Sequence, residues 1–227
     1  MKQRSKRKVS AIVMLLCIST GQLYGQAKEY SISPTELNTW ALWGQGAIAT
    51  WGNQTSLQEA DETKGILLVS PNIYGNDVIL RYKTMALTPA TVMVTLLAVS
   101  DPGDASALTI PNDYDGGINL ITEETENYFF AFKNAPHNNT PFVQKSPNST
   151  GALIAASENK MIAGVYYDIE IGKKKGKLWL KIDNELIFET EDKTPLAAGH
   201  IALRLRGTAG FKAGCLIKDM VIVGESR

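Results

Sequence analysis

The sequence has 227 residues, of which 44% are apolar, 8% aromatic and 20% charged, and its 23 basic residues balance its 23 acidic residues. This composition is typical of a globular protein and excludes disordered and fibrous chains. A net charge of zero offers no basic surface for nucleic acid.

The N-terminal residues have the pattern of a secretory signal peptide. Five basic residues and no acidic residue lie within positions 1–8, and Val9 to Ile18 is almost wholly apolar. This run is shorter than the roughly 20 apolar residues of a membrane-spanning helix, so no membrane span is expected. We expect residues 1–25 to be a signal peptide, with cleavage after Gly25 or Ala27, and residues 26–227 to form one domain. The expected location is the periplasm or the extracellular space.

Loss of this segment would change both the charge and the cysteine content. It would leave 18 basic and 23 acidic residues, a net charge of −5, which disfavours nucleic acid and anionic membranes as partners. Only Cys215 would remain, so we expect no internal disulfide and a fold held by a hydrophobic core. The pattern leaves the oligomeric state open.

Short apolar runs separated by turn residues predict an all-β chain. No stretch has the spacing of an amphipathic helix of three turns, and about a dozen strands in about 200 residues indicate a two-sheet sandwich. The expected strands are Ala47–Trp51, Gly65–Ser70, Asp77–Met85, Thr91–Ser100, Gly117–Thr122, Asn127–Phe132, Ala152–Ala156, Val165–Ile171, Lys177–Ile182, Glu185–Glu191, His200–Leu205 and Cys215–Val223.

Two tight turns and two long irregular stretches punctuate these strands. Gly172–Gly176 (GKKKG) is expected to form a turn with solvated lysines, and Asp183-Asn184 a two-residue hairpin connection in which Asn tolerates positive φ. Asp101–Gly116 and Asn134–Gly151 are expected to be irregular. Loops of this length in a compact domain usually bind or cover something.

From Tyr166 onward the sequence has three features in order: the turn at Asp183-Asn184, the glycine-initiated strand Gly199–Arg204 and the last apolar strand Ile217–Ile222. In these features it resembles the C-terminal half of concanavalin A-like (lectin/glucanase) domains. The match covers roughly the last 60 residues, and the rest of the chain agrees only in its number of strands. The resemblance implies a two-sheet antiparallel jelly-roll sandwich.

Within that superfamily the chain is most similar to secreted bacterial keto-disaccharide hydrolases and to related domains found beside pectin-degradation enzymes. The similarity lies in Gly116–Asn119, Tyr128–Lys133 and Gln144–Asn148, and it departs from the pattern at Gln144, where Arg is usual, and Asn148, where Gly is usual. It implies a carbohydrate partner. Two functions stay open: a glycoside hydrolase, or a non-catalytic carbohydrate-binding or interaction module.

Acidic residues are the first candidates for catalysis. A retaining glucanase of this fold carries Glu-x-Asp-x-x-Glu on one strand, and the nearest match, Glu59–Lys64, ends in Lys and is interpreted as a solvated loop. The densest acidic cluster contains Glu123, Glu124 and Glu126 with Asp113 and Asp115. Either it is a solvent-facing strand end, or Asp115 or Glu123 lines a sugar site. Calcium has weak support, because no loop repeats Asp at coordinating intervals.

Histidine is scarce, since only His137 and His200 occur, and this disfavours catalytic zinc. His200 begins a strand and is interpreted as structural. His137 lies in the Asn-rich stretch and is a candidate for the site. The catalytic candidates are therefore Asp115, Glu123 and His137, with no metal ligand and no cofactor expected.

Sugar rings stack on aromatic faces, and their hydroxyl groups bond to amide, carboxylate, Arg and Lys groups. Trp40 and Trp43 are interpreted as packing under the first strand, whereas Trp179 could line a concave face or pack behind it. The substrate-binding candidates are Arg81, Tyr114, Tyr128, Asn134, Lys145 and Arg204. An Arg on a strand that faces inward needs a carboxylate or a ligand as its partner.

Overall fold

The computed structural model describes residues 28–137, 140–147, 151–158 and 160–226. The expected signal peptide and both cleavage positions lie outside these residues. Within the described residues, no helix has the length and apolar character needed to cross a membrane.

Strands make up most of the described chain, and the helical segments are short. The helical segments are α1 (Pro34–Leu37), the π-helical turn η1 (Leu120–Glu124) and the 3-10 turn η2 (Ala135–His137). The strands are β1 (Lys28–Ile32), β2 (Ala41–Gly44), β3 (Gly46–Trp51), β4 (Gln54–Glu59), β5 (Ile66–Ala86), β6 (Val92–Ser100), β7 (Glu126–Lys133), β8 (Phe142–Ser146), β9 (Ile154–Ala155), β10 (Tyr166–Lys174), β11 (Lys177–Ile182), β12 (Glu185–Glu191), β13 (Gly199–Arg206) and β14 (Gly214–Ser226).

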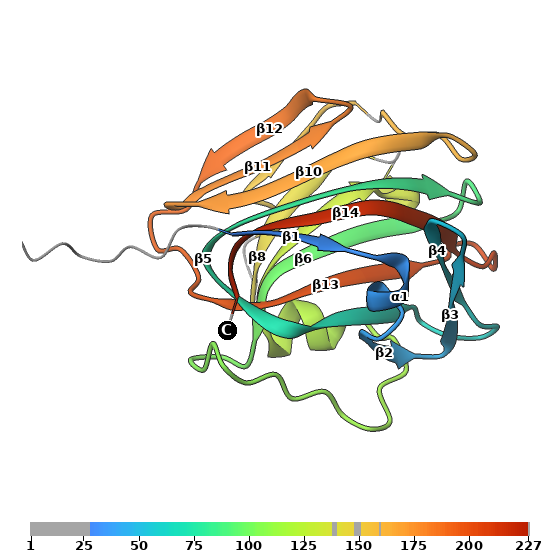
Figure 1. Ribbon diagram of the computed structural model, residues 1–227, viewed down its shortest axis with the longest axis horizontal. Coiled ribbons are helices and arrows are strands. Elements are labelled where there is room, and N and C mark those ends of the chain that lie inside the picture. The colour runs from blue at the N-terminus through green and yellow to red at the C-terminus, as the bar shows by residue number, and fades with distance from the viewer. Residues whose placement is uncertain (1–27, 138–139, 148–150, 159, 227) are drawn as a thin grey trace, which may run out of the picture.

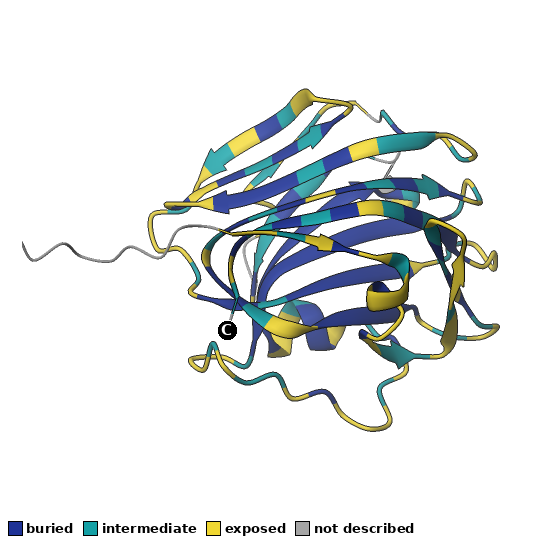
Figure 2. Ribbon diagram, in the orientation of Figure 1, coloured by how far each residue is buried: buried dark blue, intermediate teal, exposed yellow. Residues whose placement is uncertain are grey.

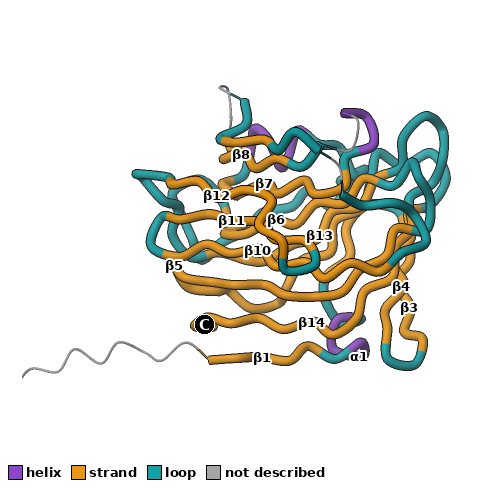
Figure 3. Tube along the Cα trace, turned by 90° about the horizontal axis from the view of Figure 1, so that it is seen from above, coloured by secondary structure: helices purple, strands orange, loops and turns teal. Residues whose placement is uncertain are grey.

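The strands form two antiparallel layers that share the long strand β5 (Figure 1). The first part of β5 pairs with β2 and β13, and the second part, from Val78 onward, pairs with β10 and β14. We call one layer the β13 layer, with the order β2-β5-β13-β6-β7-β8-β9. The other is the β14 layer, with the order β12-β11-β10-β5-β14, and β1 and β4 pair with different parts of β14. Figure 3 shows β1 and β14 on one side and β7 and β8 on the other.

The main core lies between the two layers. Alternate residues of each strand point inward, so that Leu203 of β13 and Ile171 of β10 belong to one apolar cluster while their neighbours face outward. Figure 2 shows β6 and β13 buried along most of their length, whereas β12 is mostly exposed or half-buried, with Phe188 buried. The two-sheet sandwich expected from the sequence is confirmed.

A second apolar cluster covers the outer face of the β13 layer. Here Leu67 and Val94 on the sheet pack with Ile110, Leu120 and Ile121, which belong to the long connection between β6 and β7. In Figure 1 this connection leaves the sheets and returns through η1. The stretch Asp101–Gly116 therefore does cover something, namely one face of the sandwich.

The expected strand Gly117–Thr122 is wrong. The segment forms a turn and then η1, and the Thr122 hydroxyl donates to the Ile118 carbonyl oxygen at 3.2 Å. Leu120 and Ile121 are both buried in the covering cluster. Consecutive residues of a strand point to opposite faces, so only a helical turn lets both pack on the sheet.

The two hairpin turns differ in outcome. Asp183 and Asn184 have φ values of +52° and +64°, which confirms the expected two-residue connection. The turn expected at Gly172–Gly176 is present but narrower, at Lys175-Gly176, because β10 continues to Lys174. Lys173 is 1% exposed, and its Nζ donates to the Ala197 carbonyl oxygen instead of lying in solvent.

Two further expectations on strands need correction. Gly65–Ser70 and Asp77–Met85 are parts of the single strand β5, which passes from one layer to the other. The stretch Asn134–Gly151 was expected to be irregular throughout, but it contains β8, which pairs with β7.

Candidate functional site

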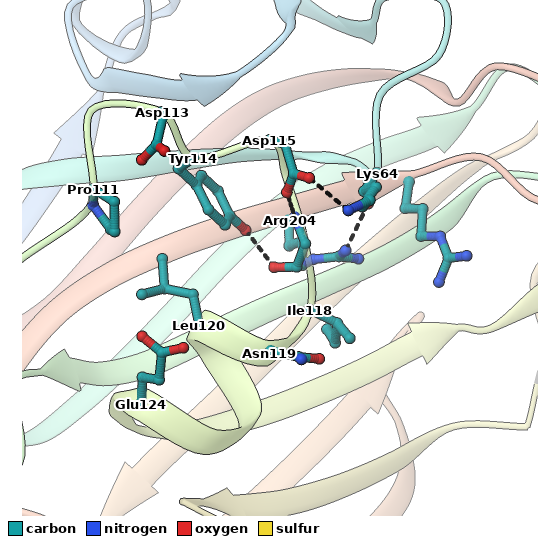
Figure 4. Close-up of a pocket in the computed structure, with 12 residues that line it drawn as sticks. Lys64, Pro111, Asp113, Tyr114, Asp115, Ile118, Asn119, Leu120, Glu124 and Arg204 are labelled. Carbon is teal, nitrogen blue, oxygen red and sulfur yellow. Dashed lines mark hydrogen bonds and ion pairs between the residues drawn. The ribbon is translucent and has the colours of Figure 1, made fainter.

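A cavity of about 420 Å³ opens on the outer face of the β13 layer, where the β6–β7 connection meets the end of β13. Residues from four segments line it: Lys64 before β5; Pro111, residues 113–115 and residues 117–119 of the connection; Leu120 and Glu124 of η1; and Arg204 and Arg206 of β13. Figure 4 shows these side chains around Tyr114. We call this hollow the Tyr114 cavity.

Arg204 forms part of its inner wall. Because Leu203 and Leu205 face the main core, Arg204 points to the opposite side of β13. Arg204 is only 4% exposed, and its Nη2 donates to the carbonyl oxygens of Lys64 (3.0 Å) and Gly116 (2.9 Å). Its Nε has no hydrogen-bond partner within the described chain. Burial lowers the pKa of the guanidinium, and the like charge of Arg206 adds to this lowering.

The rim of the cavity is fixed by contacts between residues 111–117 and the segment that leads into β5. The Asp115 carbonyl oxygen accepts hydrogen bonds from the Lys64 N–H and the Thr63 hydroxyl, both at 3.1 Å. The Asp115 carboxylate pairs with Lys64 Nζ at 2.6 Å and accepts from the Gly117 N–H at 2.9 Å. These two groups lower the pKa of Asp115. At neutral pH Asp115 is therefore an anion already engaged by a cation.

Tyr114 supplies the aromatic surface of the cavity. Its hydroxyl donates to the Gly117 carbonyl oxygen at 3.0 Å, and its ring packs partly against the covering cluster. Burial raises its pKa, so the phenol stays neutral at physiological pH. Figure 4 shows Asp113 and Glu124 on one side of this ring and Lys64 on the other.

Three charged side chains at the cavity are unpaired. Within the described ranges, no hydrogen bond or ion pair engages the side chains of Asp113, Glu124 or Arg206. Two free carboxylates and one free guanidinium are therefore available to a ligand. The cavity can accept hydrogen bonds on its acidic side and donate them on its basic side.

The structure brings together three of the nine residues expected from the sequence, namely Tyr114, Asp115 and Arg204. Glu123 is exposed on η1 but does not line the cavity, whereas the next residue, Glu124, does. Lys64 and Arg206 also line the cavity, although neither was expected there from the sequence. Arg206 had a signal, because it follows Arg204 by two positions on one strand and so shares its face.

Arg81 lies on the opposite side of the sandwich, on the outer face of the β14 layer. Its Nε pairs with Glu170 Oε2 at 2.7 Å, beside a smaller hollow of about 260 Å³. Glu170 also accepts from Lys181 and from the Trp179 indole N–H, both at 2.9 Å. Trp179 lies across Gly172, where a Cβ would come within 2.0 Å of its ring. Trp179 therefore covers the β14 layer from outside, and Arg81 is remote from the Tyr114 cavity.

Tyr128 is corrected from a sugar contact to a core residue. Its ring is 0% exposed, its hydroxyl donates to Asp192 Oδ2 at 2.6 Å, and it accepts from the Leu196 N–H at 2.9 Å. A ring with no accessible face cannot stack on a sugar. Lys145 joins the same group of residues, because its Nζ pairs with Asp192 at 2.8 Å.

Asn134 does not line the cavity. Asn134 is 5% exposed and lies away from the Tyr114 cavity, so its contact with sugar stays a prediction. His137 ends η2, and its side chain lies outside the described part of the chain, so its role stays a prediction.

His200, Glu59 and Cys215 all lie outside the Tyr114 cavity. His200 Nδ1 hydrogen-bonds to the Ser70 carbonyl oxygen at 2.8 Å, consistent with a structural role. Glu59 is not in a solvated loop: it ends β4, is 8% exposed and accepts from the Gly207 N–H at 2.6 Å. Cys215 is a buried free thiol. Among the described residues, no group of three or more His, Cys, Asp or Glu is placed to hold a metal ion.

No family model matches the chain, and no curated protein matches it in sequence. Solved structures do match its fold. A Bacillus subtilis protein of unknown function with a galectin-like fold has a TM-score of 0.74 at 14% identity, covering 89% of this chain and 97% of that one. The fold is the concanavalin A-like jelly roll.

Two further structures share this jelly roll and differ in what their descriptions say they do. The carbohydrate-binding module CBM66 from Bacillus subtilis has a TM-score of 0.53 at 10% identity, over 86% of this chain and 95% of that one. A β-1,3-1,4-glucanase from a mouse hindgut metagenome has a TM-score of 0.59 at 10% identity, over 88% and 99%. A binding module and an enzyme thus share this architecture, so the fold alone does not decide between them.

Proposed function

We propose that this protein binds carbohydrate in the Tyr114 cavity. The observation that carries the proposal is the grouping, in one hollow of about 420 Å³, of an aromatic ring with free carboxylates and a free guanidinium. Sugars present hydroxyl groups that both donate and accept, and apolar ring faces that pack on aromatic side chains. The likeness to a carbohydrate-binding module and a glucanase supports the same class of ligand.

The cavity is suited to binding because its walls are already held in place. Arg204 bonds to two carbonyl oxygens of the rim, and Lys64 bonds to Asp115 through both backbone and side chain. A site that is ordered before the ligand arrives loses less conformational entropy on binding. The rim would therefore keep its shape with or without sugar.

Asp115 is a poor proton donor for glycoside hydrolysis. A general acid in a glycosidase needs a carboxyl group that stays protonated near neutral pH, which requires a raised pKa. Lys64 and the Gly117 N–H instead lower the pKa of Asp115. We therefore assign Asp115 to the rim and not to the role of general acid.

Hydrolysis is the second candidate function, because two other carboxylates line the same cavity. Asp113 and Glu124 are unpaired within the described residues, and both lie on the same side of the Tyr114 ring (Figure 4). Glycosidases act with a pair of carboxyl groups on either side of the scissile bond. If the protein cleaves sugar, these two residues are the pair that the cavity offers.

The proposal extends to where the protein works. A basic segment followed by Val9–Ile18 favours export, and we infer a periplasmic or extracellular location. Fractionation of the producing cells, with N-terminal sequencing of the purified protein, tests this inference. Recovery of the intact N-terminus from the cytoplasm contradicts it.

The proposed function is tested with a glycan array and a reducing-sugar release assay on the purified protein. Binding without release supports a binding module. Release that is abolished in both Asp113→Asn and Glu124→Gln establishes a hydrolase. Glu123→Gln is the matched control, because Glu123 has the same chemistry on the same helical turn but does not line the cavity. Neither binding nor release on plant and host glycans contradicts the proposal.

A further inference from the structure

One wall of the Tyr114 cavity carries positive charge that lacks a carboxylate partner. Arg204 is 4% exposed, and the hydrogen bonds of its guanidinium in the described chain include the carbonyl oxygens of Lys64 and Gly116 but no carboxylate. Burying a charge without a counter-ion is costly, and proteins usually pair such a group with an acid or a ligand. Arg204 Nε is also buried without a hydrogen-bond partner.

Arg206 adds a second guanidinium on the same face. It lies two residues beyond Arg204 on β13, so both side chains project to the outer side of the β13 layer. Arg206 is exposed, and no side-chain hydrogen bond or ion pair engages it within the described residues. It is therefore free to contact a ligand, while Arg204 beneath the rim adds to the positive potential.

No carboxylate among the described residues forms a hydrogen bond or an ion pair with Arg204 or Arg206. Asp115 is occupied by Lys64 at 2.6 Å. The charge of Glu59 acts on Arg204, but Glu59 is itself buried. Its carboxylate accepts a hydrogen bond from the Gly207 N–H, and burial raises its pKa. Asp113 and Glu124 line the cavity on the far side of Tyr114 from Lys64 (Figure 4). The cavity therefore has a basic side and an acidic side.

We propose that the basic side binds the carboxylate of an acidic sugar, a uronic acid, through Arg206. A planar guanidinium matches a carboxylate with two parallel hydrogen bonds, which gives specificity as well as affinity. The hydroxyl groups of the same sugar would then donate to Asp113 and Glu124. This inference rests on the proposed function and names the class of sugar that the cavity selects.

The test compares acidic sugars with matched neutral sugars by titration calorimetry at low and moderate salt. The probes are oligomers of galacturonic acid and of glucuronic acid, their methyl esters, the corresponding galactose and glucose oligomers, and sulfated forms of the neutral oligomers. The acids are expected to bind about tenfold more tightly than their esters or neutral counterparts, because a charge-assisted hydrogen bond is lost in each of the latter.

Variants locate the effect. Arg206→Gln should reduce the ratio of acid to neutral-oligomer affinity about tenfold, and Arg206→Lys should retain part of this preference. Lys174→Gln is the control, because it removes one positive charge from the exposed end of β10, away from the cavity. Thermal unfolding of each variant verifies that it is folded.

The outcomes separate this inference from the function on which it rests. Equal binding of acids and esters, or an unchanged preference in Arg206→Gln, overturns the uronic-acid proposal while carbohydrate binding stands. Tight binding of the sulfated oligomers and not of the uronic acids overturns it in favour of a sulfated sugar. Absence of binding to every oligomer overturns both the proposed function and this inference.

Discussion

Gly116 crosses Gly65 so closely that a Cβ atom added to Gly116 would lie 1.8 Å from the Gly65 carbonyl oxygen. Gly116 also has a φ of +87°, a backbone angle that residues other than glycine rarely adopt. This crossing sets the rim of the Tyr114 cavity against the start of β5 and lets the Gly116 carbonyl oxygen accept from Arg204. The shape of the cavity thus depends on two glycines that contribute no side chain.

Gly116→Ala is expected to displace the rim and weaken sugar binding, with a loss of stability about 1–2 kcal/mol larger than that of Gly103→Ala. Gly103 belongs to the same β6–β7 connection and also has positive φ (+79°), but nothing lies within 4 Å of the position of its Cβ. Gly103→Ala therefore measures the effect of the backbone strain alone. Urea unfolding and sugar titration of both variants measure the difference, and identical behaviour of the two contradicts the role of the crossing.

Tyr128→Phe is expected to cost about 1–3 kcal/mol of folding free energy without changing sugar affinity. The hydroxyl is the donor to Asp192 and the acceptor for the Leu196 N–H, and the ring is wholly buried. Tyr30→Phe is a suitable comparison, since its hydroxyl bonds with the Ser226 hydroxyl near the chain end and should matter less. A loss of sugar binding in Tyr128→Phe, with stability intact, would return Tyr128 to the site.

Glu170→Gln tests the ion-pair network on the opposite face. Burial raises the pKa of Glu170, but hydrogen bonds from Arg81, Lys181 and Trp179 outweigh it and bring the pKa down to about 2. A carboxyl group whose pKa is depressed by folding contributes stability above its unfolded pKa, near 4.5, and loses it as the pH falls through about 2.

The variant should therefore be less stable than the wild type by about 1–2 kcal/mol at pH 7, after allowance for solvent screening, and the gap should close between pH 4.5 and pH 2. Urea unfolding across this range measures it. Glu189→Gln, which removes an exposed pair with Lys177, should show almost no gap. A gap for Glu170→Gln that does not change with pH argues against the network.

Lys173→Met tests the buried lysine on β10. Burial lowers the pKa of Lys173 to about 8, from 10.5, so the folded protein binds its proton less tightly than the unfolded chain does. Between pH 8 and 10.5 the unfolded state holds more protons, and stability contributed by this group rises with pH. The wild type should gain stability relative to the variant over this interval in denaturant unfolding. A constant difference between the two proteins contradicts the shift.

The alternating strands after Tyr166 were predictable because each carries a clear two-residue period, and the structure places β10 to β13 close to the expected ranges. β5 was divided in two because Pro71 and Gly75 resemble turn residues, whereas the chain passes through them while changing layers. The helical turn at Leu120 was missed because its apolar residues also fit a strand. Tertiary packing on the β13 layer decided between these alternatives.

The candidate site was predictable only in part, for a physical reason. Tyr114, Asp115 and Arg204 stand out by residue type, but Lys64 joins them through a contact across 51 positions of sequence, which no local pattern encodes. Tyr128 and Lys145 have the right chemistry for sugars and were assigned to the site. Their hydrogen bonds to Asp192 instead hold the link between β12 and β13 against β7 and β8.

A crystal structure of the protein with the oligosaccharide that binds most tightly tests the central claim most directly. We expect a sugar ring in the Tyr114 cavity, with a carboxylate at Arg206 and hydroxyl groups at Asp113 and Glu124. A sugar seated instead on the outer face of the β14 layer, beside Arg81 and Trp179, with the Tyr114 cavity empty, would contradict it.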